Sequence, residues 1–300
     1  MAEKVTNQLA LQTDDPNAKT LSKFLGMPKV QQSLLGTLGN QKEMQKFTSS
    51  IMSAATANPD LQNCDFSTVV SAGLLANALN LSLSPTLGFA YIVPFKNKAK
   101  GEVKDATFVL GYKGYIQLAI RSGYYKKINV LEIKEGELIS FDPLNEEIEV
   151  RLIQDEEERE KAKTIGYYAM FEHVNGFRKV IYWSKSKMIA HADKYSPAFS
   201  KNAVTTGKVT KVSYADYEAG NYPKGDEWKY SSFWYKDFDE MAKKTLIRQL
   251  ISKWGIMSID MQKAYDADTE AMKNVDTLPS DGISDPIGDF FGGKPTEQAE

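Results

Sequence analysis

The amino-terminal third of the chain carries apolar residues at the spacing of α-helices. Between residues 41 and 57, apolar side chains recur every three or four positions, and Asn58-Pro59 ends the pattern. Asp65 or Ser67 is a suitable N-cap for a second helix. We therefore expect two helices that form a core or a subunit contact. Residues 1–28 hold few large apolar side chains, which predicts a flexible segment.

The middle of the chain has the short apolar runs and turn residues that are typical of strands. Runs at 89–95 and 106–110 flank a lysine-rich loop and predict a hairpin with a basic tip. A helix should follow from Gly111, with Gly123 as its C′ residue. Asn175-Gly176 is a strong signal for a two-residue hairpin turn. The remaining strands are expected at 125–133, 138–141, 148–153, 164–171 and 177–183.

The carboxy-terminal part returns to helical patterns. Ser184 is an N-cap for a helix over 185–194, and 233–254 has the strongest helical pattern, ending at Gly255. The stretch 196–231 between them has little periodicity, and a compact domain seldom tolerates so long a loop unless it is functional. The order of elements indicates an α+β fold, in which a small antiparallel sheet built from hairpins packs against helices, with an amino-terminal helical part.

Composition excludes several classes of protein. The chain has one cysteine (Cys64) and two histidines (His173 and His191), too few for a disulfide framework or a Cys/His zinc site. No apolar run approaches the roughly 20 residues of a membrane span. The polar start lacks a signal peptide, so we expect a cytoplasmic protein without membrane contact. The sequence lacks G-x-x-x-x-G-K-[ST] and G-x-S-x-G, which argues against a P-loop motor and a serine hydrolase. We expect no cofactor and no metal ion.

The formal net charge of −2 is the sum of opposed segments. Residues 266–300 carry nine acidic side chains and two lysines, so the rest of the chain has a charge of +5. Within that rest, 94–134 and 185–254 are rich in cations, whereas 135–160 holds eleven acidic residues against two arginines. Such blocks predict a molecule with opposed charged faces, and the net charge alone excludes no class of partner.

Both cation-rich segments also contain aromatic residues and glycines, the combination that single-stranded nucleic acid requires. Cations along a path neutralise phosphates, and flat rings stack on unpaired bases. Gly111 and Gly114 would let the backbone approach a phosphate. The alternative, that these side chains are solvated lysines and core tyrosines, stays open. The candidate DNA-binding residues are Lys113, Arg121, Lys126, Lys127, Lys185, Lys187, Lys194, Lys208, Lys211, Lys243, Lys244, Arg248, Tyr112 and Tyr115.

One enzymatic alternative also stays open. Glu132-Ile133-Lys134 on a predicted strand matches the E-x-K half of a metal-dependent nuclease motif, with Asp105 as an upstream carboxylate. In such a site the acids would hold Mg²⁺ and the lysine would orient a water molecule. The tripeptide is common on strands with one polar face. We therefore expect no catalytic residue, and the nuclease using Glu132 and Lys134 is the alternative function.

Three stretches of the sequence indicate a protein family more specifically than the charge pattern does. The first joins Asn77-Ala78-Leu79-Asn80-Leu81-Ser82-Leu83-Ser84-Pro85 to Phe89-Ala90-Tyr91-Ile92-Val93-Pro94-Phe95. The second is Leu110-Gly111-Tyr112-Lys113-Gly114-Tyr115-Ile116-Gln117-Leu118-Ala119-Ile120-Arg121-Ser122-Gly123, and the third is Lys243-Lys244-Thr245-Leu246-Ile247-Arg248-Gln249-Leu250. Together they resemble the RecT/Redβ family of phage single-strand annealing proteins, of the kind found in phages or prophages of Gram-positive hosts. The resemblance covers about residues 30 to 255.

The resemblance implies a DNA-annealing recombinase that works without ATP, on a core similar to that of Rad52-type annealing proteins. It implies binding of single-stranded DNA and of the annealed duplex in a basic groove, and assembly into rings or helical filaments. The partners it implies are a 5′-to-3′ exonuclease and the host single-strand-binding protein. Lys113 and Arg121 lie in the second stretch, and Lys243, Lys244 and Arg248 lie in the third.

Pattern and resemblance together divide the chain into three parts. Residues 1–28 form the flexible segment, and 29–265 form a core for DNA binding, annealing and oligomerisation. Residues 266–300 form an acidic flexible tail, a candidate for partner binding. Within the core, one side of the last predicted helix, opposite its aromatic residues, carries Lys244, Arg248 and, nearly in register, Lys253, and we expect that side to face DNA.

Overall fold

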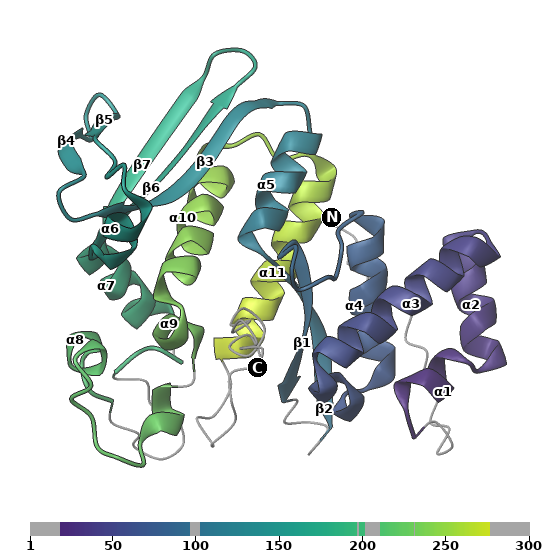
Figure 1. Ribbon diagram of the computed structural model, residues 1–300. Coiled ribbons are helices and arrows are strands. Elements are labelled where there is room, and N and C mark those ends of the chain that lie inside the picture. The colour runs from purple at the N-terminus through teal and green to yellow at the C-terminus, as the bar shows by residue number, and fades with distance from the viewer. Residues whose placement is uncertain (1–18, 97–102, 197, 202–210, 231, 277–300) are drawn as a thin grey trace, which may run out of the picture. The chain divides into compact units, whose positions relative to one another are not determined.

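The computed structural model describes residues 19–96, 103–196, 198–201, 211–230 and 232–276. They form two compact units, one that ends at Leu110 and one that begins at Gly111 (Figure 1). The sequence predicts one core over 29–265, whereas the packing divides this range between the strand that ends at Leu110 and the helix that follows. The two units are described in turn.

The first unit begins with helices. These are α1 (Leu21–Leu25), α2 (Pro28–Leu38), α3 (Gln41–Ala57), the short 3₁₀ helix η1 (Pro59–Asn63) and α4 (Phe66–Ala78). Asp65 caps α4 by accepting a hydrogen bond from the amide of Ser67, as its sequence position predicts. In α1, Leu21 and Phe24 are buried, so the described end of the predicted flexible segment is folded. The rest of that segment, 1–18, lies outside the described residues.

A hairpin completes the first unit. Strands β1 (Ala90–Lys96) and β2 (Lys104–Leu110) pair antiparallel, and α4 packs against both of them. The hairpin is confirmed where the sequence places it. Its predicted basic tip, 97–102, lies outside the described residues.

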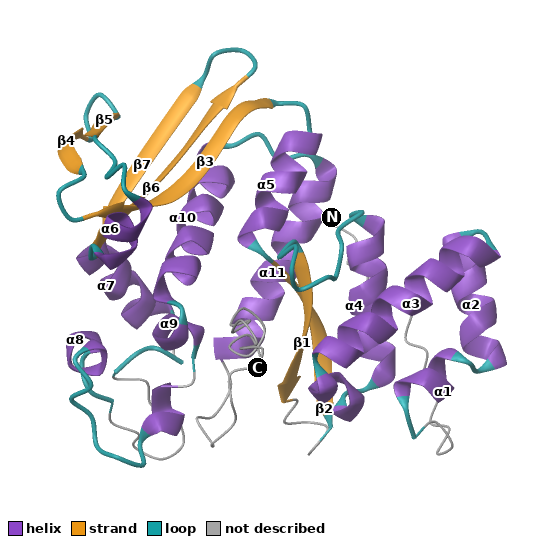
Figure 2. Cartoon of the chain, in the orientation of Figure 1, coloured by secondary structure: helices purple, strands orange, loops and turns teal. Residues whose placement is uncertain are grey.

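The second unit contains a three-stranded antiparallel sheet in the order β3-β6-β7 and a separate hairpin, β4-β5 (Figure 2). The turn between β6 and β7 lies at Asn175-Gly176 as predicted, but its loop has three residues and not two. The amide of His173 donates to the carbonyl of Phe177, the amide of Gly176 donates to the carbonyl of His173, and Gly176 has a left-handed φ of +88°. The strands are β3 (Tyr125–Lys134), β4 (Leu138–Asp142), β5 (Glu147–Val150), β6 (Thr164–His173) and β7 (Arg178–Ser184).

Helices pack against this sheet. The long helix α10 (Phe238–Trp254) packs against all three strands of the larger sheet, and α5 and α11 lie beside it (Figure 1). The helix predicted over 233–254 is broken at Asp237, which caps α10 by accepting from the amide of Glu240. The other helices are α5 (Tyr112–Arg121), α6 (Glu156–Lys161), α7 (Lys185–Tyr195), α8 (Tyr214–Glu218), η3 (Glu227–Tyr230), α9 (Phe233–Lys236) and α11 (Ile259–Asp276).

The structure changes two of the expectations for the carboxy-terminal half of the chain. The predicted tail starts at 266, but α11 continues to Asp276 and buries Asp268 completely. The described part of 196–231 is not an open loop, because Tyr217 packs its ring 5.1 Å from Tyr230 and 4.8 Å from Tyr235. These tyrosines of a cation-rich segment therefore build a local core.

The fold class is confirmed as α+β with small antiparallel sheets packed against helices. Among the described residues, none of the helices has the length and apolar character needed to span a bilayer.

Candidate nucleic-acid interface

Helix α7 carries an exposed group of cations and aromatic rings. Ser184 ends β7 and caps α7, since its side chain accepts a hydrogen bond from the amide of Lys187 at 3.2 Å. Met188 and Ala192 turn inward and are buried. Positions four apart stack on one side of a helix, so Lys187 and His191 share the outward side.

On this side the aromatic rings contact one another, and lysine ammonium groups lie over two of the rings. The ring centroid of His191 lies 5.1 Å from that of Trp183 and 4.6 Å from that of Tyr195. The ammonium of Lys187 lies 4.7 Å from the centre of the Trp183 ring, and that of Lys194 lies 5.0 Å from the Tyr195 ring. We call this set, completed by Lys253 of α10, the α7 face: Trp183, Lys187, His191, Lys194, Tyr195 and Lys253.

The lysines of the α7 face are exposed and not neutralised. Among the described residues, no carboxylate pairs with Lys187, Lys194 or Lys253. Desolvation lowers the pKa of His191, and the positive charges around it, chiefly Lys253 and Lys194, lower it further. The single carboxylate of α7, Asp193, accepts a hydrogen bond from the backbone amide of Lys201. The face is therefore a locally positive surface, in which the ring of Tyr195 is open, with 57% of the residue exposed, and those of Trp183 and His191 are partly exposed.

A second cation–aromatic group lies at the end of α10. The ring of Trp254 has the ammonium of Lys179 at 4.5 Å and that of Lys253 at 5.7 Å from its centre. Lys179 is not free, because it pairs with Glu146 in the turn between β4 and β5. Trp254 thus extends the aromatic character of the α7 face through the shared Lys253.

Four predicted cations lie on α5 and at the start of β3. Lys113, Arg121, Lys126 and Lys127 are all exposed. Lys126 forms an ion pair with Glu172 at 2.6 Å, whereas among the described residues Lys113 and Lys127 have no carboxylate partner. This group remains a candidate second stretch of a phosphate path.

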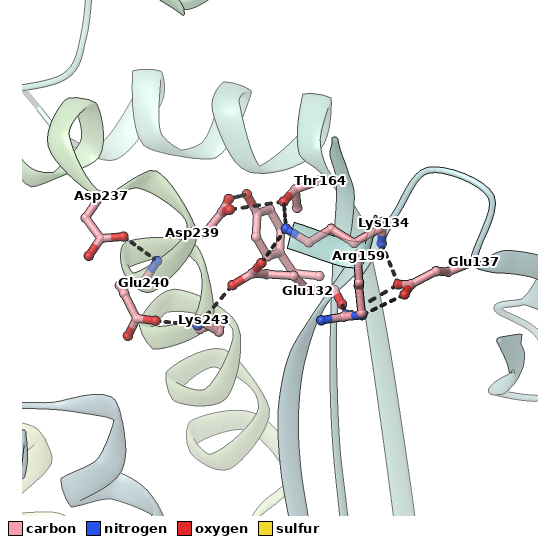
Figure 3. A network of polar contacts seen from close by, with 10 residues as sticks. Glu132, Lys134, Glu137, Arg159, Thr164, Asp237, Asp239, Glu240 and Lys243 are labelled. Carbon is pink, nitrogen blue, oxygen red and sulfur yellow. Dashed lines mark hydrogen bonds and ion pairs between the residues drawn. The ribbon is translucent and has the colours of Figure 1, made fainter. Parts of the chain in front are cut away.

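Lys243 belongs to a polar network rather than to an open surface (Figure 3). The ammonium of Lys243 pairs with Glu240 and lies 3.1 Å from Glu132. It also lies 5.7 Å from the centre of the Tyr112 ring. Although burial opposes the charge, the two carboxylates raise the pKa of Lys243. The network therefore connects α10 to β3, and the charge of Lys243 is neutralised by carboxylates of the same chain.

The same network weakens the nuclease alternative. The second oxygen of Glu132 lies 2.8 Å from the ammonium of Lys134, so each carboxylate oxygen of Glu132 faces a lysine. Lys134 is itself buried and donates to Thr164 at 2.9 Å (Figure 3). A divalent cation at Glu132 would have to displace both ammonium groups. Among the described residues there is no group of three or more side chains suited to hold a metal ion.

Three further candidates are inside the fold. The ammonium of Lys244 lies 3.0 Å from Asp268 of α11, and the hydroxyl of Tyr115 donates to the same carboxylate at 2.9 Å. Arg248 donates to Thr269 at 2.7 Å. The Lys244 and Arg248 side of α10, which we expect to face DNA, packs against α11 in this structure. Tyr115 is buried and does not offer its ring to a base.

The remaining predicted cations have other partners. Lys185 pairs with Glu218 at 2.7 Å and lies above the Tyr214 ring. Lys211 is buried and donates to the carbonyl of Ala198, and desolvation lowers its pKa to about 8. Lys208 lies outside the described residues.

The candidate DNA-binding residues include two members of the α7 face, Lys187 and Lys194, and the predicted cation side of the last helix includes a third, Lys253. The signal for the others is a spacing of four, since Trp183, Lys187, His191 and Tyr195 follow at equal intervals. On a helix this spacing gives one stripe. The stripe is hard to predict from the sequence because its first residue, Trp183, belongs to the preceding strand.

Comparison with known proteins agrees with the resemblance seen in the sequence. The family model described as RecT family matches residues 45–279. The protein YqaK of Bacillus subtilis (strain 168) is 38% identical over 257 residues, which cover 86% of this chain and 75% of that protein. Protein RecT of Escherichia coli (strain K12) is 27% identical over 258 residues, which cover 86% of this chain and 83% of that protein. The chain therefore belongs to the RecT family, the family of DNA-binding proteins that anneal single strands in recombination.

Proposed function

We propose that this chain anneals complementary single strands of DNA without ATP, and that the α7 face holds one of the strands. The observation that carries the proposal is the alternation, along α7, of lysines without a carboxylate partner and partly exposed rings that contact one another at a tilt. Membership of the RecT family supports the same activity. The absence of a P-loop motif from the sequence supports independence from ATP.

The chemistry of the face suits a strand that must still find its complement. Lysines attract phosphates whatever the sequence. A ring that stacks on a base uses the flat face of that base and leaves its pairing edge open. A second strand can then be tested by base pairing, so specificity comes from the DNA and not from the protein. No bond is made or broken, so no catalytic residue is needed.

One α7 face offers only a few contacts, so self-association matters for the function. Copies side by side would link many weak sites into one salt-sensitive platform for a long strand. Lys113, Arg121 and Lys127 would extend the path on each copy. We also propose that the chain works with a 5′-to-3′ exonuclease that supplies single strands, and with the single-strand-binding protein of the bacterial cytoplasm.

Binding to a labelled oligonucleotide tests the assignment of the face. Lys187→Ala combined with Lys194→Ala should weaken binding about tenfold and lower the salt slope by about 0.7 for each phosphate that the variant no longer neutralises. Lys161→Ala with Lys163→Ala removes the same charge from exposed positions in the acid-rich part of the unit and is the matched control. Equal affinities and equal slopes for the two variants would contradict the assignment.

Annealing itself is tested with two complementary oligonucleotides and no nucleotide cofactor. The wild-type chain should accelerate pairing, measured by a fluorophore and quencher on opposite strands, and added ATP should not change the rate. The Lys187→Ala, Lys194→Ala variant should anneal more slowly than its control. No acceleration by the wild-type chain would overturn the proposed function.

A further inference from the structure

The sequence beyond α11 contains a short acidic repeat. Residues 281–284, 285–288 and 289–292 read Asp-Gly-Ile-Ser, Asp-Pro-Ile-Gly and Asp-Phe-Phe-Gly. Each block begins with aspartate, has an apolar residue in third place and ends in serine or glycine. The repeat therefore presents a carboxylate and an apolar side chain in turn, every four residues.

This order is the chemical complement of the α7 face. That face alternates ammonium groups with aromatic rings, and among the described residues its lysines have no carboxylate partner. Carboxylates would pair with Lys187 and Lys194, and isoleucine or phenylalanine side chains would cover the rings of Trp183 and Tyr195. The same contacts serve a DNA strand, since phosphate and base stand in for carboxylate and apolar side chain.

The spacings agree. Lys187 and Lys194 are seven residues apart on α7, a rise of about 10 Å along the helix. Aspartates four residues apart on an extended chain are separated by at most about 14 Å. Lysine side chains are long enough to absorb the difference. Two successive aspartates of the repeat can therefore reach the two lysines while the apolar residue between them lies over His191.

The repeat can also reach the face from its own chain. The ion pair of Lys244 with Asp268 and the hydrogen bond of Arg248 to Thr269 show that α11 returns along α10. Thirteen residues separate Asp276, where α11 ends, from Asp289, a reach of up to about 45 Å when extended. This exceeds the length of α10, whose 17 residues span about 25 Å.

We propose that the acidic repeat at 281–292 binds the α7 face of its own chain when DNA is absent. Its consequence for DNA binding rests on the proposed function of that face. The repeat then competes with DNA by occupying the same lysines and rings. A long strand that engages many copies displaces it, whereas a short oligonucleotide that engages one copy does not. The chain thereby selects long single strands.

The two histidines give a test that needs no DNA. In the full chain labelled at the histidine rings, an NMR titration reports His191 at the face and His173 inside the sheet. A bound repeat places carboxylates near His191 and raises its pKa. Asp281→Asn, Asp285→Asn and Asp289→Asn together should therefore lower the pKa of His191 relative to wild type, and leave that of His173 unchanged. An unchanged pKa of His191 would overturn the proposal.

Binding of a short oligonucleotide gives the second readout. Asp285→Asn with Asp289→Asn should tighten binding roughly three- to tenfold at low salt. Glu297→Gln with Glu300→Gln removes the same charge outside the repeat and should change binding far less. If the aspartate variants shift His191 but leave DNA binding unchanged, the repeat binds the face while DNA does not, and the proposed function of the face fails. If both variant pairs tighten binding equally, the repeat has no specific role.

Discussion

The ammonium of Lys244 lies 3.0 Å from the carboxylate of Asp268, with 5% and 0% of the two residues exposed. The pair joins α10 to α11, and the hydroxyl of Tyr115 adds α5 to the same carboxylate. A buried charge is tolerated because it is paired and hydrogen-bonded. The acidic helix therefore acts as a structural part of the second unit.

This pair predicts a large loss of stability on removal of its acid. Asp268→Ala leaves Lys244 as an uncompensated buried charge and should lower the free energy of unfolding by about 3 kcal/mol. Urea denaturation followed by circular dichroism measures the loss. Lys244→Met with Asp268→Leu removes both charges and should recover most of it. If the Asp268→Ala variant is as stable as wild type, the ammonium of Lys244 must reach solvent in that variant.

Base stacking on the α7 face is tested at its most exposed ring. Tyr195→Ala should weaken binding of single-stranded DNA about fivefold or more, because a stacked base contributes roughly 1–3 kcal/mol. Tyr195→Phe keeps the ring and should bind as wild type does. Since Tyr195 is 57% exposed, neither change should affect the fold. Equal binding by the two variants would mean that no base stacks there.

The α7 face also predicts a dependence of DNA binding on pH. Desolvation and neighbouring cations keep the pKa of His191 below 6.5, so this ring is mostly neutral at pH 7. Bound phosphates favour the charged ring and raise its pKa, so DNA binding by a chain that ends after Asp276, and therefore lacks the acidic repeat, takes up a proton. Affinity should therefore rise as the pH falls from 8 to 6, by up to about tenfold for each unit that DNA raises the pKa. His191→Gln should flatten this profile.

The second histidine affects stability instead. His173 stacks 4.4 Å from Phe171 and packs edge-on against Tyr125, and its Nε2 has no hydrogen-bond partner. Burial lowers the pKa of His173 from 6.5. The unfolded chain therefore takes up the proton first, and the free energy of unfolding should fall as the pH drops below 6.5. His173→Phe should lose less stability than wild type between pH 7 and pH 5, measured by urea midpoints.

Local signals in the sequence predict much of the fold. Ser184, Asp65 and Asn175-Gly176 act through hydrogen bonds or turn geometry within a few residues. The structure confirms the two caps and the position of the turn, although the turn has three loop residues instead of two. The break at Asp237 escapes prediction because aromatic residues on both sides continue the helical spacing.

The binding residues are harder to predict, because the partner of a cation is often distant in the chain. Lys244 and Asp268 are 24 positions apart, and Lys185 and Glu218 are 33 apart. Composition shows only that cations exceed carboxylates in a segment. It does not show which cations stay unpaired, and that is what distinguishes Lys187 from Lys244.

The course of α11 bears on how this protein should be shortened for study. A chain ended at residue 265, where its sequence turns acidic, would lose Asp268 and uncover Lys244 and Arg248. Two cations that are internal in the complete fold would then attract DNA by themselves. Ending the chain after Asp276 keeps α11 whole, and only then can a gain in DNA binding be assigned to the missing tail.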